Sequence, residues 1–418
     1  MELMTKQGFK QTEVGLIPED WDVIAIGNLI NTSKQWSFSG GPFGSDLKSS
    51  DYTNEGIRVI QLQNIGVGKF INKSKVFTSV EKADYLMSSN IYPGNIIFSK
   101  MGDPVARVCL IPDFHSRYVM CSDGIKFVVD GQKYDKTYVF RALSDIGFLK
   151  RAEAASTGST RKRIGLPDLK ALPIPLPPTL TEQKAIATAL SDVDALIASL
   201  EQTITKKKAI KQGAMQELLI VTEDWTTKTI REVATYRRGS FPQPYGLAKW
   251  YDDISGMPFV QVVDVAKNKK LKAETKQKIS AEGAKMSVFV KKGSVILTIQ
   301  GSIGRICITQ YDAYVDRTLL IFESFKEDFN TYFFMISIWL KFQIEKEKAP
   351  GGIIKTITKE ALSSFEISFP NREEQDRIAE VLEDIEKEIN MLETKKVKYQ
   401  AIKQGMMQEL LTGKTRLI

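Results

Sequence analysis

Long polar side chains occur where predicted strands of the first half pass into loops. Gln61, Gln63 and Asn64 end one strand, and Lys100 and Arg107 flank a later turn. Amide groups can pair with adenine edges, and guanidinium or ammonium groups can bind guanine edges or phosphates. These residue types therefore suit base readout in duplex DNA. Polar decoration of a strand end explains the three amides equally well.

A basic run on a polar loop is the strongest cationic candidate of the chain. A run of charges is usually a solvated face. Here it follows small hydroxyl residues at a loop that the second half keeps, which favours contact with phosphate or guanine. The first-half candidates for DNA contact, with this run at the end, are Ser45, Lys48, Gln61, Gln63, Asn64, Lys100, Arg107, Ser159, Thr160, Arg161, Lys162 and Arg163.

Matched places in the second half carry different polar side chains. The candidates at these matched places are Gln261, Asp264, Gln300, Arg305 and Lys355. Arg237, Arg238, Gln243 and Tyr245 form an additional candidate loop. Because the side chains differ at corresponding positions, we expect the two halves to read different sequences.

Groups typical of catalytic and metal sites are missing from the sequence. The single histidine, His115, leaves no HExxH motif or histidine cluster, and no GxxxxGK[ST] or GxSxG motif occurs. The three cysteines, Cys109, Cys121 and Cys307, do not have metal-ligand spacing. We therefore expect a binding protein without a metal or cofactor of its own. The competing hypothesis is a methyltransferase or nuclease that carries its own recognition domains.

The segments that must position these residues occur twice in the chain. Thr181–Val221 recurs as Glu373–Gly413 at a constant offset of 192 positions. Within it, Ala209–Leu219 and Ala401–Leu411 differ at one place only, Ala214 against Met406. Such self-similarity indicates two copies of one structural unit.

Apolar residues in the repeated segment recur at spacings of three and four, which predicts a long helix that lies along another helix. At 1.5 Å per residue a helix of about 40 residues is about 60 Å long and outreaches its own domain. The other copy is the obvious partner. The helix-pairing residues are Ile186, Leu190, Val193, Ile197, Leu200 and Ile204, then Ile378, Leu382, Ile385, Ile389 and Leu392.

Each predicted helix contains one glycine, Gly213 or Gly405, at an estimated cost of about 1 kcal/mol against alanine. The repetition of this cost in both copies favours a close helix crossing or the docking of another subunit over the alternative, a tolerated kink. The docking candidates are Gly213, Gln216, Glu217, Gly405, Gln408 and Glu409.

The sequence predicts an α+β fold with a pseudo-two-fold internal repeat. The expected segments are a mixed α/β domain at 1–178, a long helix at 179–221, a second mixed domain at 222–371 and a long helix at 372–418. Single helical segments are expected at about 135–154 and 328–348. The second unit ends where the first would begin again, so we expect the termini to lie close together.

Bulk composition is that of a globular protein, and its modest basic excess fits a polyanionic partner and ordinary solubility charge equally well. The 418 residues are 43% hydrophobic, and the formal net charge is +8. The longest apolar run, Tyr332–Leu340, is too short to cross a bilayer, and the first ten residues lack an apolar signal region. We therefore expect a cytoplasmic protein.

Several short motifs occur in the same order in both halves and together resemble one known family. They are Leu16–Trp21, Gly40–Tyr52, Pro173–Pro178 running into Thr181–Gln183, and Gln216–Leu219, with Arg372–Gln375 and Gln408–Lys414 in the second half. This layout resembles the specificity subunit of type I restriction–modification systems over essentially the whole chain. Arg237–Asp253 departs from the pattern, because it does not copy Gly40–Tyr52.

The resemblance implies two target recognition domains separated by two long antiparallel coiled-coil helices. Each domain would read one half of an asymmetric bipartite site in double-stranded DNA. The helices would set the spacer and dock two methyltransferase subunits, which carry S-adenosylmethionine and methylate adenine N6. Two restriction/translocase subunits would supply ATP- and Mg²⁺-dependent cleavage. The chain itself would be a non-catalytic subunit.

Overall fold

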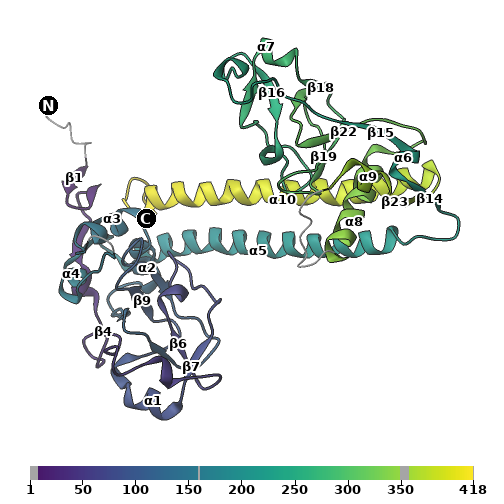
Figure 1. Ribbon diagram of the computed structural model, residues 1–418. Coiled ribbons are helices and arrows are strands. Elements are labelled where there is room, and N and C mark those ends of the chain that lie inside the picture. Colours follow the sequence, from purple (N-terminus) through teal and green to yellow (C-terminus); the bar gives the residue numbers. More distant parts are fainter. Residues whose placement is uncertain (1–7, 159–160, 349–356, 418) are drawn as a thin grey trace. The chain divides into compact units, whose positions relative to one another are not determined.

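The computed structural model describes residues 8–158, 161–348 and 357–417 (Figure 1). The chain divides into two compact units. Unit 1 comprises Met1–Gln202 together with Glu393–Ile418, and unit 2 comprises Thr203–Leu392. Each unit therefore contains one mixed α/β globule and one half of each long helix. These units cut across the four segments expected from the sequence, because the helices belong to both.

The two long helices are α5 (Leu180–Leu218) and α10 (Arg372–Leu410), drawn in teal and yellow in Figure 1. Each has 39 residues, so both are slightly shorter than the expected segments. Ion pairs in unit 1 join Asp194 to Lys403 at 2.6 Å and Glu201 to Lys396 at 3.8 Å. In unit 2, Lys207 pairs with Glu388 at 2.7 Å. Numbers rise on one helix as they fall on the other, which confirms the predicted antiparallel pair.

The predicted helix-pairing residues lie on the covered faces of both helices. Ile186 and Leu190 join the core of unit 1, and Ile378 and Leu382 join that of unit 2. Leu200, Ile204 and Ile389 are buried as well, whereas the remaining seam residues Val193, Ile197, Ile385 and Leu392 are partly buried. The ends of each seam thus also anchor a globular domain, a role that the helical pattern alone did not predict.

Unit 1 is built on two sheets. The first has the order β10-β9-β12-β4 and the second β5-β7-β6-β11-β8, in which β6 and β11 run parallel. Their bounds are β4 Phe38–Gly40, β5 Tyr52–Thr53, β6 Ile57–Ile60, β7 Val76–Thr78, β8 Asn90–Ile91, β9 Ile96–Ser99, β10 Val108–Leu110, β11 Tyr118–Met120 and β12 Gly124–Phe127.

Smaller elements complete unit 1. Two short ladders pair β1 (Phe9–Thr12) with β2 (Gly15–Pro18), and β3 (Asp22–Ala25) with β13 (Pro173–Leu176). The helices are α1 Val80–Tyr85, α2 Lys136–Leu143, α3 Ile146–Ala154 and α4 Leu166–Ala171.

Unit 2 repeats this plan with the sheets β15-β22-β19-β20 and β17-β16-β21-β18 and the ladder β14-β23. The strands are β14 Thr226–Thr229, β15 Ala234–Arg238, β16 Met257–Val260, β17 Gln277–Ile279, β18 Val288–Val290, β19 Val295–Thr298, β20 Ile306–Ile308, β21 Ala313–Val315, β22 Leu319–Phe325 and β23 Glu366–Phe369. The helices are α6 Ile230–Val233, α7 Ala281–Ala284, α8 Thr331–Lys348 and α9 Lys359–Ser363. The predicted pair of mixed α/β domains is thus confirmed.

The single helix expected at 135–154 is wrong in detail. The segment breaks into α2 and α3, because Asp145 leaves the helical conformation and accepts a hydrogen bond from the Gly147 amide at 2.7 Å. This is an N-cap, which favours a new helix start over continuation of the old one. Its counterpart in unit 2, α8, is continuous.

A buried glutamine fastens each globule to its long helix. The Gln183 amide nitrogen donates to the Pro177 carbonyl at 3.1 Å, and its oxygen accepts from the Asp135 backbone at 2.9 Å. Gln375 makes the equivalent bonds, to the Pro370 carbonyl at 2.9 Å and from the Asn330 backbone at 3.1 Å. In each unit one side chain therefore connects the long helix to the end of the preceding strand and to the start of a further helix, which is α2 in unit 1 and α8 in unit 2.

The C-terminal segment closes unit 1. Arg416 donates to both carboxylate oxygens of Asp20, at 2.9 and 3.0 Å, and to both of Glu182. Its guanidinium also lies 5.8 Å from the ring centre of Trp21. The hydrogen bond from Arg416 is the main reason why the pKa of Asp20 is lowered. The first and last parts of the chain thus meet within this unit.

The Arg416→Ala variant should lower the free energy of unfolding of unit 1 by about 3 kcal/mol. The Glu182 side chain is only 3% exposed, and removal of its partner leaves a buried carboxylate unpaired. Denaturant unfolding followed by tryptophan fluorescence measures the loss. Lys414→Ala is the matched control, because Lys414 is an exposed cation of the same segment. Equal midpoints for the two variants would contradict the role of Arg416.

Candidate nucleic-acid interface

Arg107, a predicted DNA contact, is used inside the fold. Its Nε donates to the Ile65 carbonyl at 2.9 Å, and its Nη2 to the Leu62 carbonyl at 3.4 Å. Its Nη1 donates to the carbonyls of Asp103 and Pro104, both at 3.3 Å. The side chain thereby joins two loops that are some 40 residues apart in the sequence. Arg107 positions these loops rather than pointing away from them, which corrects the sequence-based interpretation.

Arg305 plays part of the same role in unit 2, because its Nη1 donates to the Val265 carbonyl at 3.1 Å. Among the described residues this is the one side-chain hydrogen bond of Arg305, so most of its guanidinium donors are available. Arg305 therefore remains a candidate for contact, whereas Arg107 does not.

Asn64 and Asp264 also stabilise their loops through hydrogen bonds to the backbone, and both are buried. Asn64 accepts from the Gln61 backbone at 2.9 Å and donates to the Ile71 carbonyl at 2.9 Å. Asp264 accepts from the Gln261 backbone at 2.9 Å. The prediction that these two side chains contact DNA is wrong, because burial and backbone hydrogen bonds occupy them.

The glutamines at the same strand ends keep polar edges toward solvent. The Gln61 oxygen accepts from the Gln63 amide at 3.0 Å and from the Ser74 hydroxyl at 2.8 Å. This arrangement orients both amides side by side at the surface of the loop. Gln300 is exposed in unit 2, and Gln261 is half-buried there.

The basic run contributes mainly Arg161 to the free surface. Lys162 pairs with Glu153 at 2.5 Å, and Arg163 pairs with Asp123 at 3.0 Å. Arg161 is exposed, and its side chain has no hydrogen bond or ion pair within the part of the chain that the structure describes. The candidates Ser159, Thr160 and Lys355 lie outside the described residues.

Backbone hydrogen bonds bring the candidate loops of unit 1 to one edge. The Gly41 amide donates to the Gly124 carbonyl at 2.8 Å, and the Lys100 amide donates to the Asp123 carbonyl at 2.6 Å. The Ile164 amide in turn donates to the Lys100 carbonyl at 3.0 Å. The loop that carries the exposed Ser45 and Lys48 therefore meets the 100–107 turn and the basic loop.

Unit 2 makes corresponding bonds, although its sequence differs. The Ile299 amide donates to the Thr318 carbonyl and the Gly239 amide to the Leu319 carbonyl, both at 3.0 Å. Gly239 thus occupies the place of Gly41. A Cβ would lie 2.3 Å from a carbonyl oxygen at Gly239 and 1.8 Å at Gly41, so only glycine fits either position. Arg237–Asp253 is therefore the structural counterpart of the Gly40–Tyr52 stretch.

The same equivalence matches Phe43 with Phe241, two aromatic residues that the sequence analysis missed. Phe43 is 82% exposed, whereas Phe241 is 9% exposed. Phe241 lies 4.6 Å from the Tyr245 ring centre, and the Arg317 guanidinium lies 4.6 Å from the Phe241 ring centre. The two edges thus share a scaffold and present different surfaces. The available signal was the Gly-x-Phe pattern at both positions.

The other candidates of unit 2 are accessible. Arg237, Arg238 and Gln243 are exposed, and Tyr245 projects from the same loop. Arg237 lies 3.9 Å from Glu323, a solvent-exposed pair that contributes little to stability. These side chains are thus free to contact a ligand.

The predicted docking residues lie on open helix faces. A Cβ at Gly213 or Gly405 would meet no atom within 4 Å, which excludes a close helix crossing at these glycines among the described residues. Ile210 and Ile402, three residues earlier in each helix, are exposed as well. The docking candidates Gln216, Glu217, Gln408 and Glu409 are all exposed. An uncovered surface thus occurs twice.

Comparison with known proteins identifies the family. The profile described as "Type I restriction modification DNA specificity domain" matches residues 18–212 and 222–401. The chain belongs to this family of type I specificity subunits. The expected resemblance is therefore confirmed, and each repeat corresponds to one specificity domain.

Relatives of the specificity subunit match along its whole length. A protein described as the putative MjaX specificity subunit of Methanocaldococcus jannaschii is 25% identical, with 100% of this chain and 99% of the relative covered. The EcoBI specificity subunit of Escherichia coli is 26% identical over 92% of this chain and 85% of its own.

Solved structures share the fold. The S subunit of a type I system from M. genitalium superposes with a TM-score of 0.60 at 14% identity, covering 98% of both chains. A chain from a study of type I complex assembly and conformational transition gives 0.59 at 15% identity, covering 96% of this chain and 99% of that one. At such identity the likeness establishes the architecture alone.

No group of three or more His, Cys, Asp or Glu side chains among the described residues is arranged to hold a metal ion. Within the same residues, no helix combines the length and apolar character needed to span a membrane.

Arg161 and Arg107 should respond differently to substitution. Arg161→Ala should make the negative slope of log K against log salt for duplex binding less steep by about 1. The free energy of unfolding should not change, because an exposed cation contributes nothing to the hydrophobic core. Arg107→Ala should lower the free energy of unfolding by about 1–3 kcal/mol, because it leaves the loop carbonyls without their hydrogen-bond donor. Salt-dependent binding and denaturant unfolding measure the two effects. The assignments would be reversed if Arg161→Ala lost stability and Arg107→Ala did not.

Proposed function

We propose that this specificity subunit directs a type I restriction–modification complex to an asymmetric bipartite site in double-stranded DNA. Each recognition domain reads one half of the site. The observation that carries the proposal is the duplicated loop edge, in which the same backbone bonds at Gly41 and Gly239 support different side chains. One scaffold with two chemical surfaces suits one protein that reads two sequences.

The long helices would set the spacer and dock the partner subunits. Support comes from the repeated exposure around Gly213 and Gly405, where Ile210 and Ile402 are uncovered apolar residues. Two equal surfaces suit two copies of one partner. The partners would be two methyltransferase subunits with S-adenosylmethionine and two restriction subunits with ATP and Mg²⁺, which together methylate adenine N6 and cleave DNA in the cytoplasm.

The chain itself would contribute recognition and no catalysis. Incubation of the purified subunit with S-adenosylmethionine and duplex DNA tests this point. Methylation by the subunit alone would favour the competing hypothesis, a methyltransferase with its own recognition domains. Sequence-selective binding without methylation supports the proposal.

Exchange of residues 222–370 for the second recognition domain of another specificity subunit should change one half of the target only. The segment lies between the two long helices and carries all the candidate contacts of unit 2. Modified bases can be mapped by single-molecule sequencing of host DNA. A change in both half-sites would contradict independent reading by the two domains.

A chain of residues 1–221 should dimerise and direct methylation to a palindrome made of the first half-site. In the full chain, Leu410 and Leu411 pack in the core of unit 1. Leu218 and Leu219 occupy the same places at the offset of 192, so a second copy can supply them as a two-fold partner. Light scattering and sequencing with the methyltransferase present measure both results. An asymmetric target would overturn the pseudo-two-fold arrangement.

A further inference from the structure

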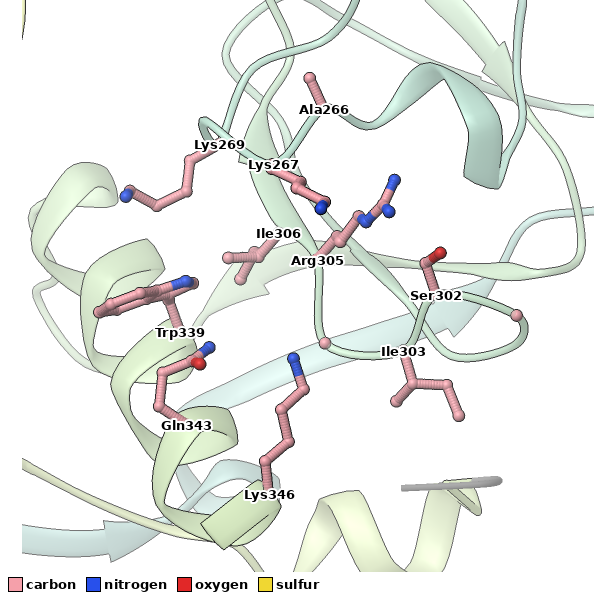
Figure 2. A pocket seen from close by; sticks show the side chains of 12 residues that line it. Ala266, Lys267, Lys269, Ser302, Ile303, Arg305, Ile306, Trp339, Gln343 and Lys346 are labelled. Atoms are coloured by element: carbon pink, nitrogen blue, oxygen red, sulfur yellow. The ribbon is translucent and has the colours of Figure 1, made fainter. Parts of the chain in front are cut away.

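A basic pocket lies in unit 2, and its lining does not include the loop that carries Phe241. It has a volume of about 450 Å³ and is lined by three segments. They are the loop Ala266–Lys269, the turn Gly301–Arg305 between β19 and β20, and the α8 face with Trp339, Gln343 and Lys346. Figure 2 shows these side chains around the opening.

The lining carries four cations and no carboxylate. Lys267, Lys269, Arg305 and Lys346 contribute the positive charges, and the polar groups of Ser302 and Gln343 stand among them. Lys267 and Lys346 have no ion-pair partner among the residues that the structure describes. Cations that line one hollow repel one another, so an anion bound there would relieve the repulsion.

Lys269 is held in an unusual conformation. Its φ is +61°, in the left-handed region that disfavours residues with a Cβ. Its ammonium lies 4.8 Å from the ring centre of Trp339, and burial is the main reason why its pKa is lowered. Lys211 and Glu386 of the long helices also face it, but these two pair with each other at 2.5 Å. A strained, desolvated lysine thus stands at the pocket wall.

Unit 1 has no such pocket lining at the corresponding loop. The loops correspond because Asn64 and Asp264 cap them in the same way. Gly68, with φ +66°, takes the place of Lys269. A Cβ on Gly68 would lie 3.5 Å from Ser144, which follows α2. In unit 2 the neighbour of Lys269 is instead Trp339 of α8. The lysine at this position of the pocket wall is therefore not required by the shared scaffold.

We propose that this pocket binds a phosphate ester, and that its ligand in function is a phosphodiester of the DNA held by the second recognition domain. The proposal rests on the proposed function. Lys267, Lys346 and Arg305 would bind the phosphate oxygens, with Ser302 as a further donor. The Trp339 ring offers an apolar face for the adjoining sugar or base. Gln300, next to the pocket turn, would place readout beside this phosphate contact.

The test compares the full chain with the double variant Lys267→Gln/Lys346→Gln. The probe is duplex DNA that contains the mapped target, and binding is measured from low to high salt. The variant should lower the slope of log K against log salt by about 1–2, because each phosphate contact contributes about 0.9. Lys291→Gln/Lys292→Gln is the control, because it removes the same charge from exposed positions of unit 2 outside the pocket.

A third variant, Lys269→Gly, separates binding from folding. It introduces the residue that unit 1 has at this place and relieves the left-handed strain. We expect an unchanged or higher thermal midpoint together with weaker DNA binding. A merely structural Lys269 would instead give a lower midpoint and unchanged binding, which would overturn its assignment to the site.

A second arm identifies the source of the phosphate. Inorganic phosphate and dAMP are titrated against the fluorescence of the full chain, with Trp339→Phe as the reference. Saturation by dAMP at micromolar concentration would assign a free nucleotide and overturn the DNA ligand. A salt slope reduced by about 1–2 in the pocket variant alone, without such saturation, supports the phosphodiester. Equal slopes for pocket and control variants reject the site, whereas absence of target selectivity in the unmodified chain rejects the proposed function instead.

Discussion

The buried amides of Gln183 and Gln375 are the contacts on which the rest of the architecture depends. Each amide donates to the carbonyl of a proline that directly follows a strand and accepts from one backbone N–H at the start of a helix. An unpaired buried amide is costly, so the three segments can meet in one way only. The long helix is thereby fixed to the globule at its first turn, and the seam residues that follow face the partner helix.

With the helices fixed, the loop edges can vary without loss of the scaffold. Arg107 and Asn64 bind carbonyls and amides of the backbone, as Arg305 and Asp264 do in unit 2. Side chains that bind the backbone constrain its course and leave the outward residues free to differ. The contrast between the open Phe43 and the stacked Phe241 shows how far the two surfaces have diverged. Such an arrangement supports changes of recognition at little cost in stability.

The duplication, the long helices and the family could be predicted from the sequence, because the repeat is contiguous and its apolar spacing is regular. The roles of individual polar residues could not. Whether Arg107 turns to solvent or to the Ile65 carbonyl depends on a loop 42 residues away, which no local pattern reports. The match of Gly239 with Gly41 was hidden by dissimilar neighbours and emerged only from strand hydrogen bonds. The cations of the basic pocket come from three separate segments, so no single run of charge in the sequence predicts it.

The contacts of Arg416 have a consequence for synthesis of the chain. Asp20 and Glu182 emerge early from the ribosome, but their partner Arg416 follows 234 residues after Glu182. Unit 1, which begins first, is therefore completed last, after unit 2 has all of its residues. A frameshift or stop codon shortly before position 416 would injure the first recognition domain rather than the second. A chain cut short before Arg416 would leave Glu182 buried without its partner.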